Sequence, residues 1–341
     1  MTDVNKPVFF KSNRVRRIYT GGAMFSDFFG DNSTDGFYPE EWVCSVTKAL
    51  NLGSTDPKEG IAVTEDGDYF DDVIQNNRES VLGNRNELGV LVKMLDSAIR
   101  LPVQCHPDKA FSRKFFHSEH GKAESWVILA TRPGACIYFG FKEKISLEKF
   151  EKALDEGDEA LKPLLNKIDV KPGDVFFIPA KAVHAIGEGC MLLETQEPTD
   201  FTIQPEKTCG DYVLADEEKY LGINPSDAMS CFDMDIVGEY AESLTRKFPK
   251  TVGNKQYIIT QQDTDCFGVN RYILKNDESE KLQGTAIYVV TEGSGKLVGE
   301  EYCREIKKGD YFFMPCICHN KFKLQSDTEM QVVQCLPPEI K

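Results

Sequence analysis

The 341-residue sequence lacks an apolar run of the roughly 18 residues that a membrane-spanning helix needs. Its amino-terminal stretch also lacks the apolar centre of a signal peptide. Basic residues are few beside acidic ones, 40 against 55, so the formal net charge is −15. Nucleic-acid binding depends on clustered lysine and arginine, which this balance does not provide. We therefore expect a cytoplasmic protein that contacts neither membranes nor nucleic acids.

Cysteine pairs of the Cys-x-x-Cys kind are also missing, although the chain has eleven cysteines. An odd number without such pairs favours reduced thiols, most of them buried as small hydrophobic residues. Hydrophobic residues make up 41% of the chain, which excludes wholesale disorder. The length predicts two domains, each large enough to bury a core.

Short runs of Val, Ile, Phe, Tyr and Trp indicate a mainly β fold from residue 108 onward. Their regular spacing, with Gly, Pro and Asp between them, is typical of a jelly roll or barrel rather than a parallel sheet. Helical patterns are expected in residues 68–84, 109–121 and 146–167. In the last of these, Ser146 is suited to cap the helix, and Gly157 interrupts the pattern.

A weak internal repeat relates two parts of the β region. Residues 171–179 contain a Gly-Asp turn and a Phe-Phe-x-Pro run that lead to His184, and residues 308–315 contain a similar run that leads to His319. The helical segment 146–167 falls inside the first copy only, so we interpret it as an insertion. The repeat therefore predicts two copies of one β module.

The second copy keeps the turn, but its upstream strand offers no histidine and no matching Gln-x-His motif, so His319 is without the partners that His184 has. Cys316, Cys318 and His319 form a Cys-x-Cys-His cluster, for which a soft-metal or redox role is the alternative to packing at a strand end. We predict a domain of residues 1–230 that includes the insertion, and a metal-free domain of residues 231–341.

Candidate metal ligands lie in the segments Leu-Pro-Val-Gln-Cys-His and Gly-Lys-Ala-Glu-Ser-Trp. If the first segment is a strand, Gln104 and His106 share one face and its apolar residues share the other. The same alternation places Lys122 and Glu124 on a common face of the second segment. The order of these motifs along the chain favours a single site.

With a histidine after the turn of the first copy, these segments offer two imidazoles, a carboxylate and an amide oxygen, a set that suits Zn²⁺. The candidate ligands are Gln104, His106, Glu124 and His184. A site without thiolates and with room for a substrate oxygen is typical of catalytic rather than structural zinc sites. Each residue alone is more often a core or surface residue, but their joint spacing favours metal binding. We expect His117 and His120 on the surface.

The chain resembles the type I phosphomannose isomerases, a branch of the cupin superfamily. Four motifs carry the resemblance: LGVLVKMLDSAIRLPVQCHPDKA, HGKAESWVILA, KPGDVFFIPAKAVHAIGEG and LLETQEPTD. The resemblance implies two cupin jelly-roll barrels, with one Zn²⁺ per chain at Gln104, His106, Glu124 and His184 in the first. It also implies interconversion of mannose 6-phosphate and fructose 6-phosphate without a redox cofactor. Glu40 and Trp42 resemble the family's opening pattern, with Pro39 in place of its Gly.

This isomerisation moves a proton between C2 and C1 through an enediol, so the site needs a base and a means of stabilising a negative oxygen. Lys122 is one candidate base, because a nearby divalent cation favours the neutral form of a lysine. Glu194 is the other, since it matches an acidic active-site position of the family. The residues alone leave open which of the two takes the proton.

Two positions depart from the family's pattern. Pro102 replaces a Ser that would face the substrate, and Gln204 replaces the catalytic Arg ten positions after Glu194. An Arg can neutralise an enediolate or a phosphate with its charged fork, whereas a Gln is neutral. We predict that Gln204 and the nearby Lys207 contact the substrate there.

Lys93 and Arg100 flank the Gln-x-His segment and are alternative phosphate partners, although we expect both to be ordinary surface charges. The departures keep a second hypothesis open, a cupin paralogue that binds sugar phosphate with weak or no isomerase activity. A metal-dependent dioxygenase of the same superfamily is disfavoured, because Gln104 supplies a fourth ligand. The expected partner is a small sugar phosphate, and the expected state is a monomer or homodimer.

Overall fold

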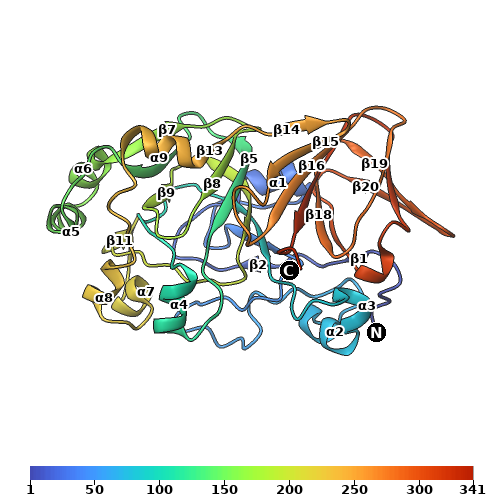
Figure 1. The fold of residues 1–341 in the computed structure, drawn as a ribbon, viewed down its shortest axis with the longest axis horizontal. Coiled ribbons are helices and arrows are strands. Elements are labelled where there is room, and N and C mark those ends of the chain that lie inside the picture. Colours follow the sequence, from blue (N-terminus) through green and yellow to red (C-terminus); the bar gives the residue numbers. More distant parts are fainter. Residues whose placement is uncertain (341) are drawn as a thin grey trace.

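Strands dominate the structure, a computed structural model that describes residues 1–340 of the chain (Figure 1). Two large antiparallel sheets form its centre. The first contains, in spatial order, β13 (Arg246–Lys247), β8 (Val175–Ile178), β5 (Glu124–Thr131), β10 (Cys190–Gln196), β4 (Leu91–Asp96), β3 (Glu40–Val43) and β2 (Arg14–Val15). The second contains β1 (Val8–Phe9), β21 (Tyr311–Met314), β18 (Ala286–Glu292), β23 (Met330–Leu336), β16 (Gly268–Leu274), β15 (Lys255–Ile259) and β14 (Lys250–Val252). The prediction of a mainly β fold is confirmed.

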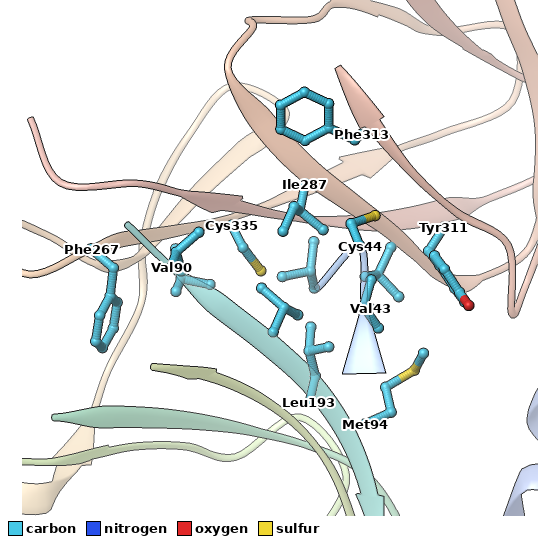
Figure 2. Close-up of a cluster of buried hydrophobic side chains, with 14 of the residues drawn as sticks. Val43, Cys44, Val90, Met94, Leu193, Phe267, Ile287, Tyr311, Phe313 and Cys335 are labelled. Carbon is cyan, nitrogen blue, oxygen red and sulfur yellow. The ribbon is translucent and has the colours of Figure 1, made fainter. Parts of the chain in front are cut away.

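The two large sheets pack face to face through a buried apolar cluster (Figure 2). Val43, Met94 and Leu193 reach this cluster from the first sheet, and Ile287 and Phe313 reach it from the second. Side chains alternate along a strand, so the residues between them point to the opposite face of the first sheet. That opposite face carries the polar residues of the site.

A smaller sheet covers part of the outer face of each large sheet. The first small sheet contains β7 (Leu165–Asp169), β6 (Cys136–Phe141) and β9 (His184–Ile186), and the second contains β17 (Ser279–Lys281), β22 (Lys323–Ser326), β19 (Ser294–Gly299) and β20 (Tyr302–Lys307). Separate apolar clusters fill these two interfaces. Within residues 1–340 the sheets form sandwiches and no closed barrel, because strands such as β2 and β14 remain at sheet edges. A short hairpin of β11 (Thr208–Cys209) and β12 (Tyr212–Val213) stands apart.

Helices connect and flank the sheets. They are α1 (Met24–Phe29), α2 (Phe70–Asn76), α3 (Arg78–Leu82), α4 (Lys109–Phe116), α5 (Leu147–Glu156), α6 (Asp158–Leu161), α7 (Asp216–Tyr220), α8 (Pro225–Met229) and α9 (Gly238–Thr245), with 3₁₀ turns at Lys162–Leu164 and Cys316–Cys318. The three predicted helical segments are confirmed. Ser146 caps α5 by accepting a hydrogen bond from the Lys149 amide at 3.2 Å, and Gly157 ends the helix with a φ of 89°. The last residues of the predicted insertion belong to β7 instead, and α7 to α9 lie where the sequence texture indicated strands.

Two short strands cross the predicted domain boundary between residues 230 and 231. β1, near the amino terminus, pairs with β21 in the second large sheet, and β13 pairs with β8 in the first. The boundary itself stays a prediction. All eleven cysteines are free and nine are buried, as expected from their scattered spacing. None of the helices in the described chain combines the length and apolar character needed to cross a membrane.

Candidate active site

The Gln-x-His segment is extended but is not a regular strand, so that part of the prediction is wrong. Isolated bridges hold it instead, one between Gln104 and His184 and one between Cys105 and Ile203. The predicted alternation is nevertheless present, since Cys105 packs in an apolar cluster while Gln104 and His106 line a cavity. Loop residues interrupt the sheet here, which leaves these side chains free to face inward.

A buried ion pair fixes the start of this segment. Arg100 donates to Glu206 at 2.7 Å, and Glu206 also accepts a hydrogen bond from the backbone amide of Val103. Arg100 further pairs with Asp158, and it does not line the cavity. Its charge is therefore used inside the fold, and it is not an ordinary surface charge.

The segment that carries Lys122 is held from both sides by one carboxylate. Glu197 accepts hydrogen bonds from the backbone amides of Gly121 at 3.1 Å and Ala123 at 3.0 Å. A Cβ at Gly121 would lie 2.6 Å from the Pro107 carbonyl oxygen, so only glycine fits there. β5 begins at Glu124, and Lys122, Glu124 and the indole two residues later all face the cavity, as the alternation predicts.

Three candidate ligands converge: His106, Glu124 and His184 are buried, and their ligand atoms all lie within 4.8 Å of one another. His106 Nδ1 contacts the Phe201 carbonyl at 2.9 Å, and His184 Nδ1 contacts the Ala182 carbonyl at 2.9 Å. A carbonyl only accepts, so each Nδ1 carries the proton and each Nε2 offers its lone pair. His184 Nε2 is buried and has no hydrogen-bond partner among the described residues.

Gln104 and Lys122 complete the surroundings of this cluster. The Gln104 side chain makes no hydrogen bond within residues 1–340, so its amide oxygen is free to act as a further ligand. Lys122 Nζ lies 2.9 Å from His106 Nε2 and contacts Glu124 Oε1. An ammonium thus sits against two of the three ligand atoms, a place where a positive charge is stabilised.

The ionisation states of the three ligands suit a cation. Burial, together with the neighbouring His106, lowers the pKa of His184 to about 3, and burial also lowers the pKa of His106. Burial alone would raise the pKa of Glu124, but its contacts with His106 and Lys122 hold it well below its usual range. Two neutral imidazoles and one carboxylate are the forms that bind metal ions.

A cavity of about 810 Å³ opens from this cluster. Lys122, Glu194 and Gln204 line it together with three of the candidate ligands, whereas His184 and Lys207 do not. Lys207 is exposed and pairs with Asp155 at 2.8 Å, so its predicted substrate contact stays a prediction that this arrangement does not support. Pro102 also lines the cavity, at the place where the family's Ser would lie.

A row of buried residues crosses the first large sheet beside the cluster. The registers pair Trp42 with Lys93, Lys93 with Glu194, and Glu194 with Trp126. The Trp126 indole donates to Glu194 Oε2 at 3.1 Å and to Glu124 Oε2 at 3.1 Å. Trp42 similarly donates to the carboxylate two residues before it. This shared Glu-x-Trp spacing is the sequence signal that could have located the row.

Lys93 is buried, which makes the expectation of a surface charge wrong. Its Nζ lies 3.5 Å from Glu194 Oε1, 3.6 Å from Asp200 Oδ1 and 3.8 Å from Glu40 Oε2. Burial disfavours its charge, but these three carboxylates together raise the pKa of Lys93. Sequence reasoning did not connect Lys93 with Asp200, because the fold alone brings the two together.

Arg17 is the second cation of this buried network, and no motif in the sequence pointed to it. It forms two hydrogen bonds to Asp200, at 2.7 and 3.0 Å, and contacts Glu40 at 2.9 Å. The Tyr19 hydroxyl also donates to Glu40, at 2.7 Å. The pKa of Asp200 is lowered even though burial opposes this, because Arg17 and Lys93 lie beside it.

Glu194 differs from these paired carboxylates. Burial, with the nearby charge of Glu124, raises the pKa of Glu194 to about 7. Its Oε1 atom is buried and has no hydrogen-bond partner in the described part of the chain. A carboxylate with an oxygen that accepts no hydrogen bond and a pKa near neutrality is suited to exchange a proton with a substrate.

The fold and this site together define an enzyme built on β-sandwiches, with a candidate metal centre at the inner end of a cavity. No protein-family model matches the chain. It is 30% identical over 326 residues to the mannose-6-phosphate isomerase of Streptococcus mutans, covering 91% of this chain and 92% of that protein. It is 28% identical over 337 residues to the mannose-6-phosphate isomerase ManA of Bacillus subtilis, covering 95% and 97%. The chain belongs to the mannose-6-phosphate isomerase family.

Solved structures agree on the fold. The crystal structure of the Bacillus subtilis mannose 6-phosphate isomerase superposes with a TM-score of 0.73 at 23% identity, over 96% of this chain and 99% of that one. The apo form from Salmonella typhimurium gives a TM-score of 0.72 at 14% identity, over 98% and 99%. The overall arrangement is thus shared at low sequence identity.

Proposed function

We propose that this chain interconverts mannose 6-phosphate and fructose 6-phosphate, with one Zn²⁺ per chain as cofactor. The observation that carries the proposal is the convergence of His106, Glu124 and His184 beside a cavity that Lys122 and Glu194 line. The family membership supports it, since both relatives named above are mannose-6-phosphate isomerases and are matched over nine-tenths of their length or more.

The residues present fit a zinc ion. Two imidazole nitrogens, a carboxylate and a free amide oxygen form a suitable donor set, and the unpartnered His184 Nε2 is explained if it binds a metal. When bound, Zn²⁺ supplies Lewis-acid polarisation of the sugar oxygens at C1 and C2. The proposed ligands are Gln104, His106, Glu124 and His184.

Within this proposal, Glu194 is the group that moves the proton. Its Oε1, which accepts no hydrogen bond, takes the proton from C2 of the aldose and returns it to C1, while the hydroxyl proton on the C2 oxygen passes to the C1 oxygen. Lys122 donates a hydrogen bond to the oxygen that becomes negative. Trp126 keeps Glu194 oriented through its indole N–H. The tight contact of Lys122 with Glu124 favours this division of roles over a basic Lys122.

We further propose that each large sheet with its small sheet is one cupin module, and that the metal lies in the first. The repeated Gly-Asp turns support this: one precedes β8 and the other precedes β21, and these strands hold corresponding places in the two copies. In the second module, the His319 ring contacts the Gly284 carbonyl through Nδ1, and the metal-ligand cluster found within residues 1–340 lies in the first.

The test is a coupled assay of mannose 6-phosphate conversion with measured metal content. We expect one Zn²⁺ per chain, loss of turnover after chelation and recovery with zinc. His184→Asn should abolish both zinc binding and activity, whereas His117→Asn, at an exposed position outside the cavity, should retain both. Zinc-loaded wild type without turnover would reject the proposal, and rescue by Gln204→Arg would then identify the sugar-phosphate-binding paralogue.

A further inference from the structure

We propose that Arg16 and Lys48 form the site that holds the substrate's phosphate at the rim of the cavity. This rests on the proposed function, because mannose 6-phosphate carries a phosphomonoester at the end of the sugar opposite the reacting carbons. Such a dianion needs cations whose charge is not already used inside the fold. The family's Arg is absent, and Gln204 stands in its place.

Five lysines and arginines among residues 1–340 line the cavity, and three of them are committed to buried carboxylates. Arg17 pairs with Asp200, Lys93 lies among three carboxylates including Asp200 and Glu194, and Lys122 contacts Glu124. These contacts are already matched in charge, and breaking a buried pair is costly. None of the three is therefore free to neutralise a phosphate as well.

Arg16 and Lys48 are the remaining two cations of the cavity wall. Both are exposed, so they lie at its solvent side, and neither forms an ion pair with any residue in the described range 1–340. Arg16 follows β2, and its guanidinium carbon lies 5.7 Å from the centre of the Phe37 ring. A guanidinium that stacks on a ring can still donate hydrogen bonds from the N–H groups at its edge. Lys48 begins the loop after β3 that forms much of the cavity wall.

Gln204 cannot take over this role in the observed arrangement. Its side-chain amide donates to the Glu218 carbonyl at 3.1 Å, and its backbone amide donates to the Lys219 carbonyl at 3.0 Å. Carboxylates of Asp56, Glu217 and Glu218 line the same cavity. A phosphate would be repelled by these groups, so both rim cations are needed to make its binding favourable.

The two cations differ in what they offer a phosphate. Arg16 presents a planar fork that can bind two oxygens at once, and Lys48 adds a mobile point charge. Both are remote from the proton transfer between C1 and C2, so they act on substrate affinity. They also give selectivity for sugar phosphates over free sugars, which lack the charged group.

The test compares Arg16→Met and Lys48→Met with wild type in the zinc-loaded enzyme. We expect each variant to raise the KM for mannose 6-phosphate about tenfold and kcat to change less than about threefold. The inhibition constant of inorganic phosphate should rise in parallel. Lys321→Met is the matched control, an exposed lysine without an ion pair that lies outside the cavity, and should match wild type.

The outcomes separate this inference from the proposed function. If wild type is active and both variants keep the wild-type KM and phosphate inhibition within about twofold, the rim site is wrong while the isomerase assignment stands. If wild type does not turn over mannose 6-phosphate at all, the proposed function fails. Arg16→Lys, which keeps the charge but not the fork, should give a smaller rise in KM than Arg16→Met.

Discussion

At the scale of single residues, the fold makes chemically similar groups behave differently. Glu124 and Glu194 both accept a hydrogen bond from the Trp126 indole, yet the pKa of Glu124 is lowered and that of Glu194 is raised to about 7. The cause is the neighbourhood: Glu124 contacts His106 and Lys122, whereas the closest cation to Glu194 is Lys93 at 3.5 Å. The first carboxylate suits a metal ligand and the second suits a base.

Replacing Glu194 with Gln tests this division. The amide keeps the size of the side chain and can still accept from Trp126, but it cannot take a proton. We expect kcat to fall about 10²- to 10⁴-fold with bound zinc unchanged, as measured by the coupled assay and metal analysis. Glu188→Gln, an exposed carboxylate just before β10, serves as the control and should be fully active.

The pH profile gives a second readout of the same residue. A base works when deprotonated, so kcat/KM of wild type should fall towards acid pH. The pKa of Glu194 is about 7 without metal, and a cation bound by the neighbouring Glu124 would lower it, so the fall should lie below pH 7 in the zinc-loaded enzyme. The residual activity of Glu194→Gln should lack this acid limb. A Glu194→Gln enzyme with more than a tenth of the wild-type kcat would exclude Glu194 as the base.

At the scale of elements, the cavity wall depends on a loop that the buried network holds. Residues 48–57 follow β3 and line the cavity. The Leu50 amide donates to Asp200 Oδ2 at 2.9 Å, and Arg17 donates to Asn51 Oδ1 at 3.2 Å. Asp200 also pairs with Lys93 at 3.6 Å, so one carboxylate supports both the loop and the face of the sheet that carries the site.

Asp200→Asn should therefore loosen this loop and destabilise the protein. It leaves Arg17 and Lys93 buried with one carboxylate fewer, at an expected cost of about 3 kcal/mol in the free energy of unfolding. Denaturant unfolding measures the cost, and limited proteolysis should cut within residues 48–57 faster than in wild type. Asp56→Asn, on the exposed part of that loop, should change neither. Equal cleavage rates in the two variants would show that Asp200 does not hold the loop.

The elements also show where sequence reasoning succeeds. The helix at 147–156 is predictable because its cap at Ser146 and its break at Gly157 are local signals. The candidate ligands are predictable because their spacing along the chain is distinctive. The network of Arg17, Lys93 and Asp200 is not, since its members are brought together by cross-strand registers and by a loop without periodicity.

At the scale of the whole molecule, a strongly acidic chain has to bind the anion proposed as its substrate. Its cations therefore serve two different purposes, some within the fold and others at the cavity entrance. The net charge of −15 opposes the approach of a phosphate ester. The buried cations are balanced by carboxylates, so they contribute little attraction at the cavity entrance. Under the proposed function, local positive charge must therefore come from the rim cations and from a metal at the candidate site. The sandwiches make this possible by separating an apolar core on one face of the first sheet from the polar site on the other.

The same burial makes the stability of the metal-free protein depend on acidity. The pKa of His184 falls from its ordinary value of 6.5 to about 3 in the folded chain, so below pH 6.5 the unfolded chain binds a proton that the folded chain does not. The contribution of neutral His184 to the free energy of unfolding is fully present above pH 6.5. It should decline by up to about 1.4 kcal/mol per pH unit below that pH. Denaturant unfolding of the metal-free protein from pH 7.5 to 4.5 measures this slope. His184→Asn should flatten it and the exposed His117→Asn should leave it unchanged, because only the first removes a histidine that is buried in its neutral form. An identical pH dependence in wild type and His184→Asn would contradict this origin of acid sensitivity.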